Sequence, residues 1–536
     1  MLCAPFLKYQ SFVAKCDYRR QSSYSPTNTS KGATSSQEIV DVKADKHRPL
    51  GHFPPDIWGD RFDNFTLEHL SRMDEYAKEI KPLKDEVRLI LMDNSTDLPQ
   101  KMRLIDVVEH VFYKFTNNKG KFKESSRSDE RGMLSLYEAA HLRIHDEHIL
   151  EEALTFTTDF LNSISTFSEQ ARLALKQPLH RGNQRLQSQR FINFYEQDFE
   201  SCDEKLLQLA KLEFNRLQLL HCQELSQIKE WCTNLDLARK FPYIRQRYVE
   251  SHYMSTIVYY EPQYSFARVL FAKFYVLLGV LDDTYDAYGT FEELEGLTDA
   301  FERWDLNSIE KFSQDYMNNM YEFVINTLDD VAKEMTSIGK PYAIYFAKEH
   351  VQRLIRNYYT EIKWMKSRYV PTFEEYMFNG RNTCCMQILG TLSLMGMEEV
   401  TETKPYIQLL QYNKVTIASS NIGRVMDDMA TGEAELARGV RLATSVECYM
   451  KDYNMSKEEV LQIFQKIIDD AWKDLVNEGL LINQCRNDDD YDHLSKPVYD
   501  RILNLARAAE SFYKFGDGLT FVKTTIKQDI VSTYVP

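Results

Sequence analysis

The 536-residue sequence has little glycine and proline, with 19 and 15 residues respectively. Proteins built from many short strands need these residues at frequent turns, so their scarcity favours long helices. The nine cysteines are scattered and contain no CxxC pair. This argues against a small disulfide framework and is typical of reduced thiols in an intracellular protein. The motifs GxxxxGK, GxGxxG and HExxH are also missing.

Positive charge is in deficit as well. Lys and Arg number 65 against 80 Asp and Glu, which gives a formal net charge of −15. A nucleic-acid scaffold normally needs a basic face, so we expect no nucleic-acid partner. The most apolar stretch, residues 269–281, is interrupted by Lys273 and ends in acid, too short to span a bilayer. We therefore expect no membrane span.

What the sequence does contain is apolar and aromatic residues, at 43% and 12% of the chain. From about residue 60 the apolar positions recur at i, i+3 and i+4, as in 206–220, which predicts amphipathic helices almost throughout. We predict an all-α protein in two helical domains, residues 41–211 and 212–536.

Residues 1–40 differ from the rest of the chain. Their first 37 positions hold ten Ser and Thr, five Lys and Arg, and one acid, Asp17. This composition is typical of a plastid transit peptide, and equally of a disordered tail. We therefore expect a cytoplasmic protein or, if the tail is a targeting peptide, a plastid one.

The first acidic motif is Asp282-Asp283-Thr-Tyr-Asp286, directly after an apolar run. On a helix Asp282 and Asp286 share a face, while Asp283 is rotated by about 100°. Three acids at the end of a buried helix repel one another unless a cation compensates, and such oxygen ligands suit Mg²⁺. The alternative is a solvated helix end that carries acids by chance.

A second oxygen-rich face follows later in the chain. Asp427, Thr431 and Glu435 are spaced at i, i+4 and i+8, which places them within about 80° of each other around a helix. Carboxylate, hydroxyl and carboxylate form a ligand set for a hard divalent ion. Arg424, one turn earlier, could hold an anion beside that ion. Alone, this pattern fits an ordinary polar helix face equally well.

A third motif is basic. Arg245 and Arg247 follow Pro242, which disfavours helix and predicts a loop. Two arginines on a loop can close over a phosphate group, although two surface arginines would look the same. Taken together, the three motifs predict Mg²⁺ ions and arginines that bind a diphosphate, with aromatic side chains available to stabilise a carbocation.

At these residues the chain resembles plant terpene synthases, specifically the sesquiterpene synthase branch. The aspartate-rich motif, the second metal motif and the upstream RxR all match in order and spacing. Further similar stretches are Arg48-Pro49 with Trp58, Glu261-Pro-Gln-Tyr264, Arg303-Trp304-Asp305 and Arg438-Gly439. The resemblance covers the chain from about residue 45 onward.

The resemblance implies an α-helical class I catalytic domain and an α-barrel-like helical N-terminal domain. It implies a lyase that ionises a prenyl diphosphate with three Mg²⁺ ions, or Mn²⁺ as a substitute, and acts as a monomer. The implied metal ligands are Asp282, Asp286, Asp427, Thr431 and Glu435. The implied substrate-binding residues are Arg245, Arg247, Asp282, Asp286, Arg424 and Asp427, and the implied catalytic residues are Asp282, Asp283, Asp286 and Asp517.

Within this family the expected reaction is conversion of farnesyl diphosphate to a sesquiterpene. Geranyl diphosphate is the alternative substrate, particularly if the tail is a plastid signal. A prenyl-elongating transferase normally carries two aspartate-rich motifs, and here the second motif is of the Asp427/Thr431/Glu435 type. No DxDD motif is present, so protonation-initiated chemistry is not expected.

The chain departs from the family pattern around the expected pocket. A tryptophan position is Met254, and two tyrosine positions near Asp517 are Phe512 and Leu519. The loss of these groups favours a simple product, acyclic or singly cyclised.

A larger departure is a gap near residues 110–112. The segment 104–110 resembles the part of the family that precedes a long helical stretch, whereas 111–121 resembles the part that follows it. We predict that roughly fifty residues, about three helices at typical lengths, are missing from the N-terminal domain. Such a loss would expose apolar faces and lower stability, and an inactive, shortened variant is the third reading of the chain.

Overall fold

The computed structural model describes residues 53–62, 65–93, 122, 130–163, 168–197, 203–304, 312–411, 413–437, 443–484 and 493–535. All of them belong to one compact unit, residues 48–536. The predicted tail 1–40, the Arg48-Pro49 pair, the junction at 104–121 and Arg438-Gly439 lie outside the described residues, so the predictions for them stay predictions.

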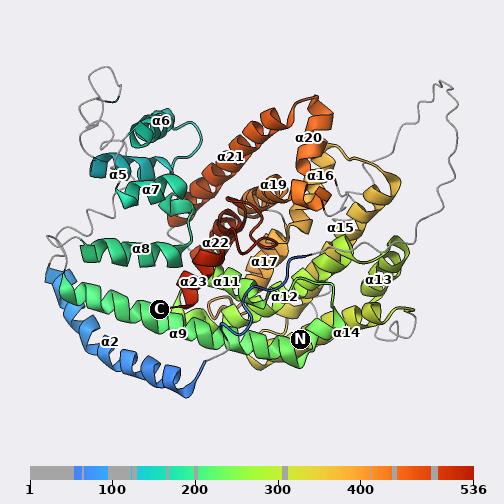
Figure 1. Cartoon of the computed structure of the whole chain (residues 1–536), viewed down its shortest axis with the longest axis horizontal. Coiled ribbons are helices and arrows are strands. Elements are labelled where there is room, and N and C mark those ends of the chain that lie inside the picture. The colour runs from blue at the N-terminus through green and yellow to red at the C-terminus, as the bar shows by residue number, and fades with distance from the viewer. Residues whose placement is uncertain are drawn as a thin grey trace. The chain divides into compact units, whose positions relative to one another are not determined.

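The described part of the chain is all-α and contains no β-strand, which confirms the predicted fold class (Figure 1). In chain order the α-helices are α2 (Leu67–Asp93), α5 (Glu130–Ala140), α6 (His148–Ser163), α7 (Glu169–Lys176), α8 (Gln184–Gln197), α9 (Glu204–Asn234), α10 (Leu237–Lys240), α11 (Tyr248–Val258), α12 (Ser265–Ala287), α13 (Phe291–Arg303), α14 (Asp315–Ser337), α15 (Ala343–Ser367), α16 (Phe373–Thr383), α17 (Met386–Ser393), α18 (Lys404–Leu410), α19 (Lys414–Ala437), α20 (Ser445–Tyr453), α21 (Lys457–Gln484), α22 (Lys496–Tyr513) and α23 (Lys527–Tyr534).

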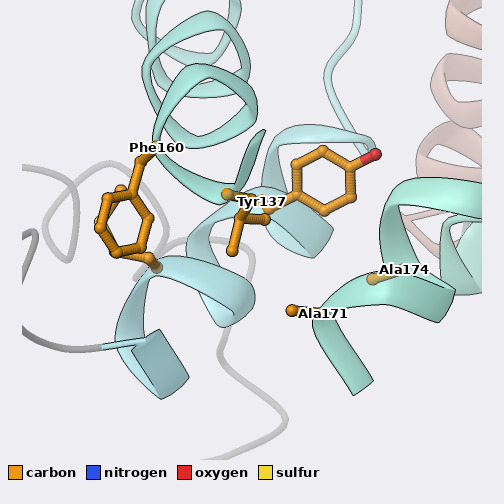
Figure 2. Close-up of a cluster of buried hydrophobic side chains, with 6 residues drawn as sticks. Tyr137, Phe160, Ala171 and Ala174 are labelled. Carbon is orange, nitrogen blue, oxygen red and sulfur yellow. The ribbon is translucent and has the colours of Figure 1, made fainter. Parts of the chain in front are cut away.

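The N-terminal helices α5, α6 and α7 enclose a small core of their own (Figure 2). Its aromatic side chains are Tyr137 of α5 and Phe160 of α6, while the fully buried side chains of α7 are only Ala171 and Ala174, with Leu175 partly buried beside them. Small residues let α7 approach the other helices closely, but they also bury little apolar area. This cluster therefore has a modest hydrophobic stabilisation.

Helix α9 continues without a break through residue 211, the predicted domain boundary. Asp203 caps its first turn by accepting a hydrogen bond from the Leu206 N–H at 2.9 Å. One side of α9 packs along α2, seen in Figure 1 as the green and blue helices. Its other side packs on α11, α12 and α23. The division into domains at 211 thus stays a prediction, with a single helix contacting both parts.

A buried polar network joins α9 to the following helices. Glu224 accepts two hydrogen bonds from Arg268, from Nε and Nη2, each at 2.8 Å. Its Oε2 also lies 3.1 Å from His252 Nε2. The second His252 nitrogen lies 2.7 Å from the Tyr534 hydroxyl of α23. Burial opposes ionisation of Glu224, but the hydrogen bonds from His252 and Arg268 outweigh it and lower its pKa to about 2.

Helix α12 lies in the interior of the C-terminal helices, with most of its apolar side chains buried. With the turn before it, the segment Pro262–Ala287 is 26 residues long and apolar enough to cross a membrane. The apolar stretch 269–281 is thus the middle of a longer apolar helix, so the expected argument from length does not hold for the helix as a whole. Some 61% of its most apolar window is buried against other helices, which marks a core helix.

Candidate active site

The aspartate-rich motif occupies the last turns of α12, as its spacing predicts. Acids are unfavourable there, since the C-terminal end of a helix carries partial negative charge and this last turn has no basic residue. The compensating cation is Arg245. Its guanidinium lies 2.7 Å from Asp282 Oδ2 and 2.6 Å from Asp283 Oδ1.

The loop that carries Arg245 is shaped by the same motif. The Arg245 backbone N–H donates to Asp283 Oδ2 at 2.6 Å, and the Phe53 ring stacks on the guanidinium at 4.6 Å. Burial opposes the charge on Arg245, but Asp283 and Asp282 overcome it and raise its pKa. Asp283 is 1% exposed. Asp283 therefore holds the loop that carries Arg245 in place, through both the backbone and the side chain of this arginine.

Arg247 is held in a different way. Its guanidinium donates to the carbonyl oxygens of Leu519 at 2.7 Å, Thr520 at 3.4 Å and Pro54 at 3.5 Å. Within the described residues it has no carboxylate within ion-pair distance, and burial lowers its pKa. A positioned cation with only neutral partners is suited to bind an anion. The predicted loop structure of this arginine pair is confirmed.

The second acidic face lies along α19, as predicted. Arg424 forms ion pairs with Asp427 and with the adjacent Asp428. Asp428 is 4% exposed and also accepts hydrogen bonds from the Tyr376 hydroxyl at 3.1 Å and the Ser445 N–H at 2.8 Å. These three partners fix Asp428 in place. Asp427 lines the cavity, and within the described residues its carboxylate accepts a hydrogen bond from Arg424 alone.

All ten predicted site residues line one cavity of about 200 Å³. They are Arg245, Arg247, Asp282, Asp283, Asp286, Arg424, Asp427, Thr431, Glu435 and Asp517. Residues up to 272 positions apart in the sequence thus converge, as the contact between Arg247 and Leu519 illustrates. The structure brings the predicted residues together, while the role of each stays a prediction.

The donor set of this cavity fits a hard divalent cation. Burial and the nearby carboxylates of Asp282, Glu361 and Glu435 raise the pKa of Asp286, so acids from α12, α15 and α19 face one another. Within the part of the chain that the structure describes, the buried Thr431 hydroxyl has no hydrogen-bond partner. Within the described residues no three acidic, His or Cys side chains already form a ligand group. In this conformation Arg245 forms ion pairs with the first acidic motif, and Arg424 forms ion pairs with the second.

Asp517 has a clear structural task in the cavity wall. Its Oδ1 accepts hydrogen bonds from the N–H groups of Leu519 at 3.0 Å and Thr520 at 2.8 Å. This turn directs the Leu519 and Thr520 carbonyls at Arg247. Asp517 thus helps to place Arg247, and its catalytic role stays a prediction.

Helix α15 supplies two site residues that the sequence did not reveal. Glu361 is half-buried and accepts hydrogen bonds from Thr383 at 2.8 Å and Asn379 at 3.0 Å, and desolvation raises its pKa to about 7. Tyr358 donates to Asp282 Oδ1 at 3.0 Å. Neither belongs to a motif with a second acid, and a single Glu on an amphipathic helix usually faces solvent. Only the packing of α15 beside α12 identifies them.

The walls of the cavity bear out the sequence departures. Met254, Phe512 and Leu519 all line it. Aromatic lining nevertheless remains, since Tyr275, Tyr358, Tyr376 and Tyr513 also face the cavity. Position 512 is Phe where the family has Tyr, but the next residue, Tyr513, lines the same cavity. The sequence comparison considered position 512 alone and did not reveal this second tyrosine.

Family models match both parts of the chain. Residues 233–474 match the model described as the terpene synthase family, metal binding domain. Residues 105–180 match the model for the terpene synthase N-terminal domain. The first range contains all the predicted site residues except Asp517.

Individual relatives cover nearly the whole chain. A valerianol synthase of Camellia sinensis and a hedycaryol synthase of Camellia brevistyla are each 37% identical over 93% of this chain and 98% of their own. A chloroplastic casbene synthase of Ricinus communis is 35% identical over 92% of this chain and 89% of its own.

Solved structures give the same picture. A limonene synthase complexed with 2-fluorolinalyl diphosphate matches with a TM-score of 0.78 at 25% identity, over 91% of this chain and 99% of its own. An isoprene synthase of grey poplar with three Mg²⁺ ions and dimethylallyl-S-thiolodiphosphate matches with a TM-score of 0.74 at 27% identity, over 89% and 98%.

The alignment with the valerianol synthase also bears on the predicted gap. It runs over 555 positions, whereas 93% of this chain is only about 498 residues. About 57 positions of the alignment are therefore gaps in this chain. That number agrees with the prediction that roughly fifty residues, about three helices of typical length, are missing.

Proposed function

The chain belongs to the terpene synthase family, and from that premise we propose that it is a class I sesquiterpene synthase. It ionises farnesyl diphosphate with Mg²⁺ and converts the carbocation to a sesquiterpene. Membership of the family makes it a lyase that acts on a prenyl diphosphate. The observation that carries the finer proposal is the convergence of two acidic helix faces and two loop arginines on one aromatic-lined cavity.

The chain's own residues bind the substrate at the polar end of this cavity. Arg247 meets the diphosphate with a guanidinium whose partners are carbonyl groups, so no ion pair has to break first. Arg245 and Arg424 exchange their carboxylate partners for phosphate oxygens. Both exchanges keep each buried charge paired, which avoids the cost of an isolated ion in a poorly solvated site.

The carboxylates released by the arginines are then available to a metal. Asp282, Asp286, Asp427, Thr431 and Glu435 would hold Mg²⁺, with three ions proposed as in the isoprene synthase complex and Mn²⁺ as a substitute. Bound Mg²⁺ supplies the positive charge that stabilises diphosphate as a leaving group.

The apolar walls carry the second half of the reaction. Phe512, Met254 and Leu389 bound the cavity and exclude water from the carbocation. Tyr275 and Tyr513 offer aromatic faces, each worth about 0.5–2 kcal/mol to a desolvated cation. Because Met254 and Leu519 replace groups that could direct further ring closures, we propose an acyclic or singly cyclised product.

The choice of farnesyl diphosphate rests on the named activities of the relatives. The valerianol and hedycaryol synthases are sesquiterpene synthases at 37% identity, against 25% for the limonene synthase structure. Geranyl diphosphate stays the alternative, because cavity contour rather than any single residue sets chain length. We also propose a monomer in the cytoplasm, or in the plastid if residues 1–40 are a targeting peptide.

A direct incubation tests the proposal. Purified protein is given Mg²⁺ and, in separate reactions, geranyl, farnesyl or geranylgeranyl diphosphate, and both volatiles and longer diphosphates are analysed. Sesquiterpenes made fastest from farnesyl diphosphate support the proposal, and monoterpenes alone support the alternative. Longer diphosphates, or no product with any substrate, would overturn it. A profile dominated by multiply cyclised hydrocarbons would refute the simple-product part.

A further inference from the structure

Tyr358 of α15 makes a contact with the aspartate-rich motif that none of the sequence motifs predicts. Its hydroxyl donates to Asp282 Oδ1 at 3.0 Å. A carboxylate can only accept hydrogen bonds, so the tyrosine is the donor. The ring is 2% exposed and stacks on Tyr285 with centroids 5.8 Å apart. The hydroxyl is thus presented to Asp282 from a fixed ring.

Asp282 is held from two sides. Tyr358 occupies Oδ1, while Arg245 occupies Oδ2 at 2.7 Å. The two donors come from different elements, one from a packed helix and one from the loop at 241–247. If Arg245 turns to a diphosphate, only the tyrosine still fixes the carboxylate.

The tyrosine is itself held at a helix break. Its oxygen lies 3.5 Å from Cys385 Sγ, at the junction between α16 and α17. Cys385 has φ of 61°, in the left-handed region that costs a non-glycine residue about 1–2 kcal/mol. A residue is kept in that conformation only where its surroundings over-determine it. The Cys385 thiol therefore has a fixed position, and its contact helps to hold the Tyr358 hydroxyl in place.

We propose that Tyr358 is a positioning residue for the metal site, which fixes the Asp282 carboxylate so that Oδ2 is the oxygen offered to the cation. The inference rests on the proposed function, since it concerns the same site. It assigns to α15 a task in metal affinity and none in the chemistry on the prenyl chain. Groups that orient a metal ligand from behind commonly change affinity by 10–100-fold when removed.

The test compares two adjacent tyrosines of one helix. Tyr358→Phe removes the hydroxyl at Asp282, and Tyr359→Phe removes a hydroxyl that donates to Glu295 at the surface, at 2.9 Å. Both lose one oxygen and one hydrogen bond to a carboxylate, and Tyr358→Phe also loses the longer contact with Cys385. Binding of Mn²⁺ is followed by electron paramagnetic resonance without substrate, alongside the Mg²⁺ dependence of turnover and thermal unfolding.

Tyr358→Phe is expected to weaken Mn²⁺ binding about 10-fold and to raise the half-saturating Mg²⁺ concentration similarly. Its rate should recover at saturating Mg²⁺, and Tyr359→Phe should match the wild type. In an Asp282→Asn background, Tyr358→Phe should add no further loss, because the two residues act through one contact. Cys385→Ala, which leaves the contact with Asp282 intact, should change affinity less than Tyr358→Phe.

Unchanged metal affinity in Tyr358→Phe would overturn the inference, even with a lowered melting temperature, since that pattern belongs to a purely structural tyrosine. An equal loss in Tyr359→Phe would overturn it too. The wild type separates this failure from that of the proposed function. If wild type binds Mn²⁺ and makes product, only the role of Tyr358 is lost; if it does neither, both proposals fall.

Discussion

The helices around the cavity and the N-terminal helices α5 to α7 bury very different material. Around α9, α11 and α12 whole ionic groups are enclosed, with Glu224, Arg268 and His252 each at most 1% exposed. The cluster of α5 to α7 is small and apolar, and one of its three helices contributes two buried alanines and a partly buried leucine. Buried ions are tolerated only where every partner is in place. The catalytic part is therefore the more completely specified.

Both regions expose large apolar side chains. In the N-terminal helices Leu67 is 83% and Phe191 69% exposed, and in the later helices Tyr453 is 58% and Phe378 56% exposed. A groove of about 700 Å³ lies between α2, α8 and α9, lined by Phe191, Leu217 and Leu220 among others. Relatives have about 57 more positions in the alignment. All predicted site residues line one cavity, and we predict that the missing positions fall in the N-terminal helices and leave their packing incomplete.

The largest expected effect separates activity from stability. Asp282→Ala should lower turnover by about 10³-fold or more, because it removes a predicted metal ligand. The melting temperature should move little, since Arg245 keeps its ion pair with Asp283. Steady-state rates and thermal unfolding measure the two. Asp329→Ala, an exposed acid in α14, is the control and should change neither; a near-normal rate in Asp282→Ala would refute the metal assignment.

The next effect tests the buried network against a surface ion pair. Glu224→Ala leaves Arg268 buried without its carboxylate and should cost about 3–5 kcal/mol of unfolding free energy. Glu169→Ala, in the exposed Glu169–Arg172 pair of α7, should produce no measurable change. Urea unfolding of both variants decides the matter. Equal losses would mean that the two regions do not differ in the way described.

A pH effect is expected at the segment that covers the arginine loop. Trp58 donates to Glu250 Oε1 at 2.8 Å, and burial raises the pKa of Glu250 to about 7, from an ordinary value of 4.5. The folded chain keeps a proton that the unfolded chain releases. Stability from this group is thus fully present below pH 4.5, falls as the pH rises to about 7, and is lost above it, by up to about 3 kcal/mol.

Glu250→Gln should remove this dependence, because the amide oxygen still accepts from Trp58 and carries no charge. Unfolding free energies at pH 5 and pH 8 are compared between wild type and variant. The unfolding free energy of the variant, relative to that of the wild type, is expected to be higher at pH 8 than at pH 5. A constant difference between the two proteins across this range would show that Glu250 does not titrate in it.

The smallest expected effect concerns the N-terminal helices directly. Inserting the corresponding segment of a relative at residues 110–112 should raise soluble yield and increase the melting temperature by a few degrees, since about 1 kcal/mol corresponds to roughly 2–4 °C in domains of this class. Turnover per folded molecule should not change. Equal thermal stability with and without the insert would contradict the view that the N-terminal packing is incomplete.

Much of this was accessible from the sequence, because the site motifs are local patterns on helices. The spacing of Asp427, Thr431 and Glu435 predicts a shared helix face, and α19 bears it out. The sequence could not tell that Asp283 and Asp428 are almost fully buried and fixed by several hydrogen bonds, since spacing does not report burial. Tyr358 and Glu361 were missed for a related reason: their importance arises from the packing of α15 on α12.

The hydrogen bonds of Arg247 also bear on how the chain reaches its active state. This one side chain joins the carbonyl of Pro54, 193 residues earlier, to that of Leu519, 272 residues later. Contacts of such high sequence separation form late in folding, because the chain must close its longest loops first. A chain still emerging from the ribosome before residue 519 has no anchor for this arginine. Diphosphate binding should therefore appear among the last properties the molecule gains, after most of its helices have formed.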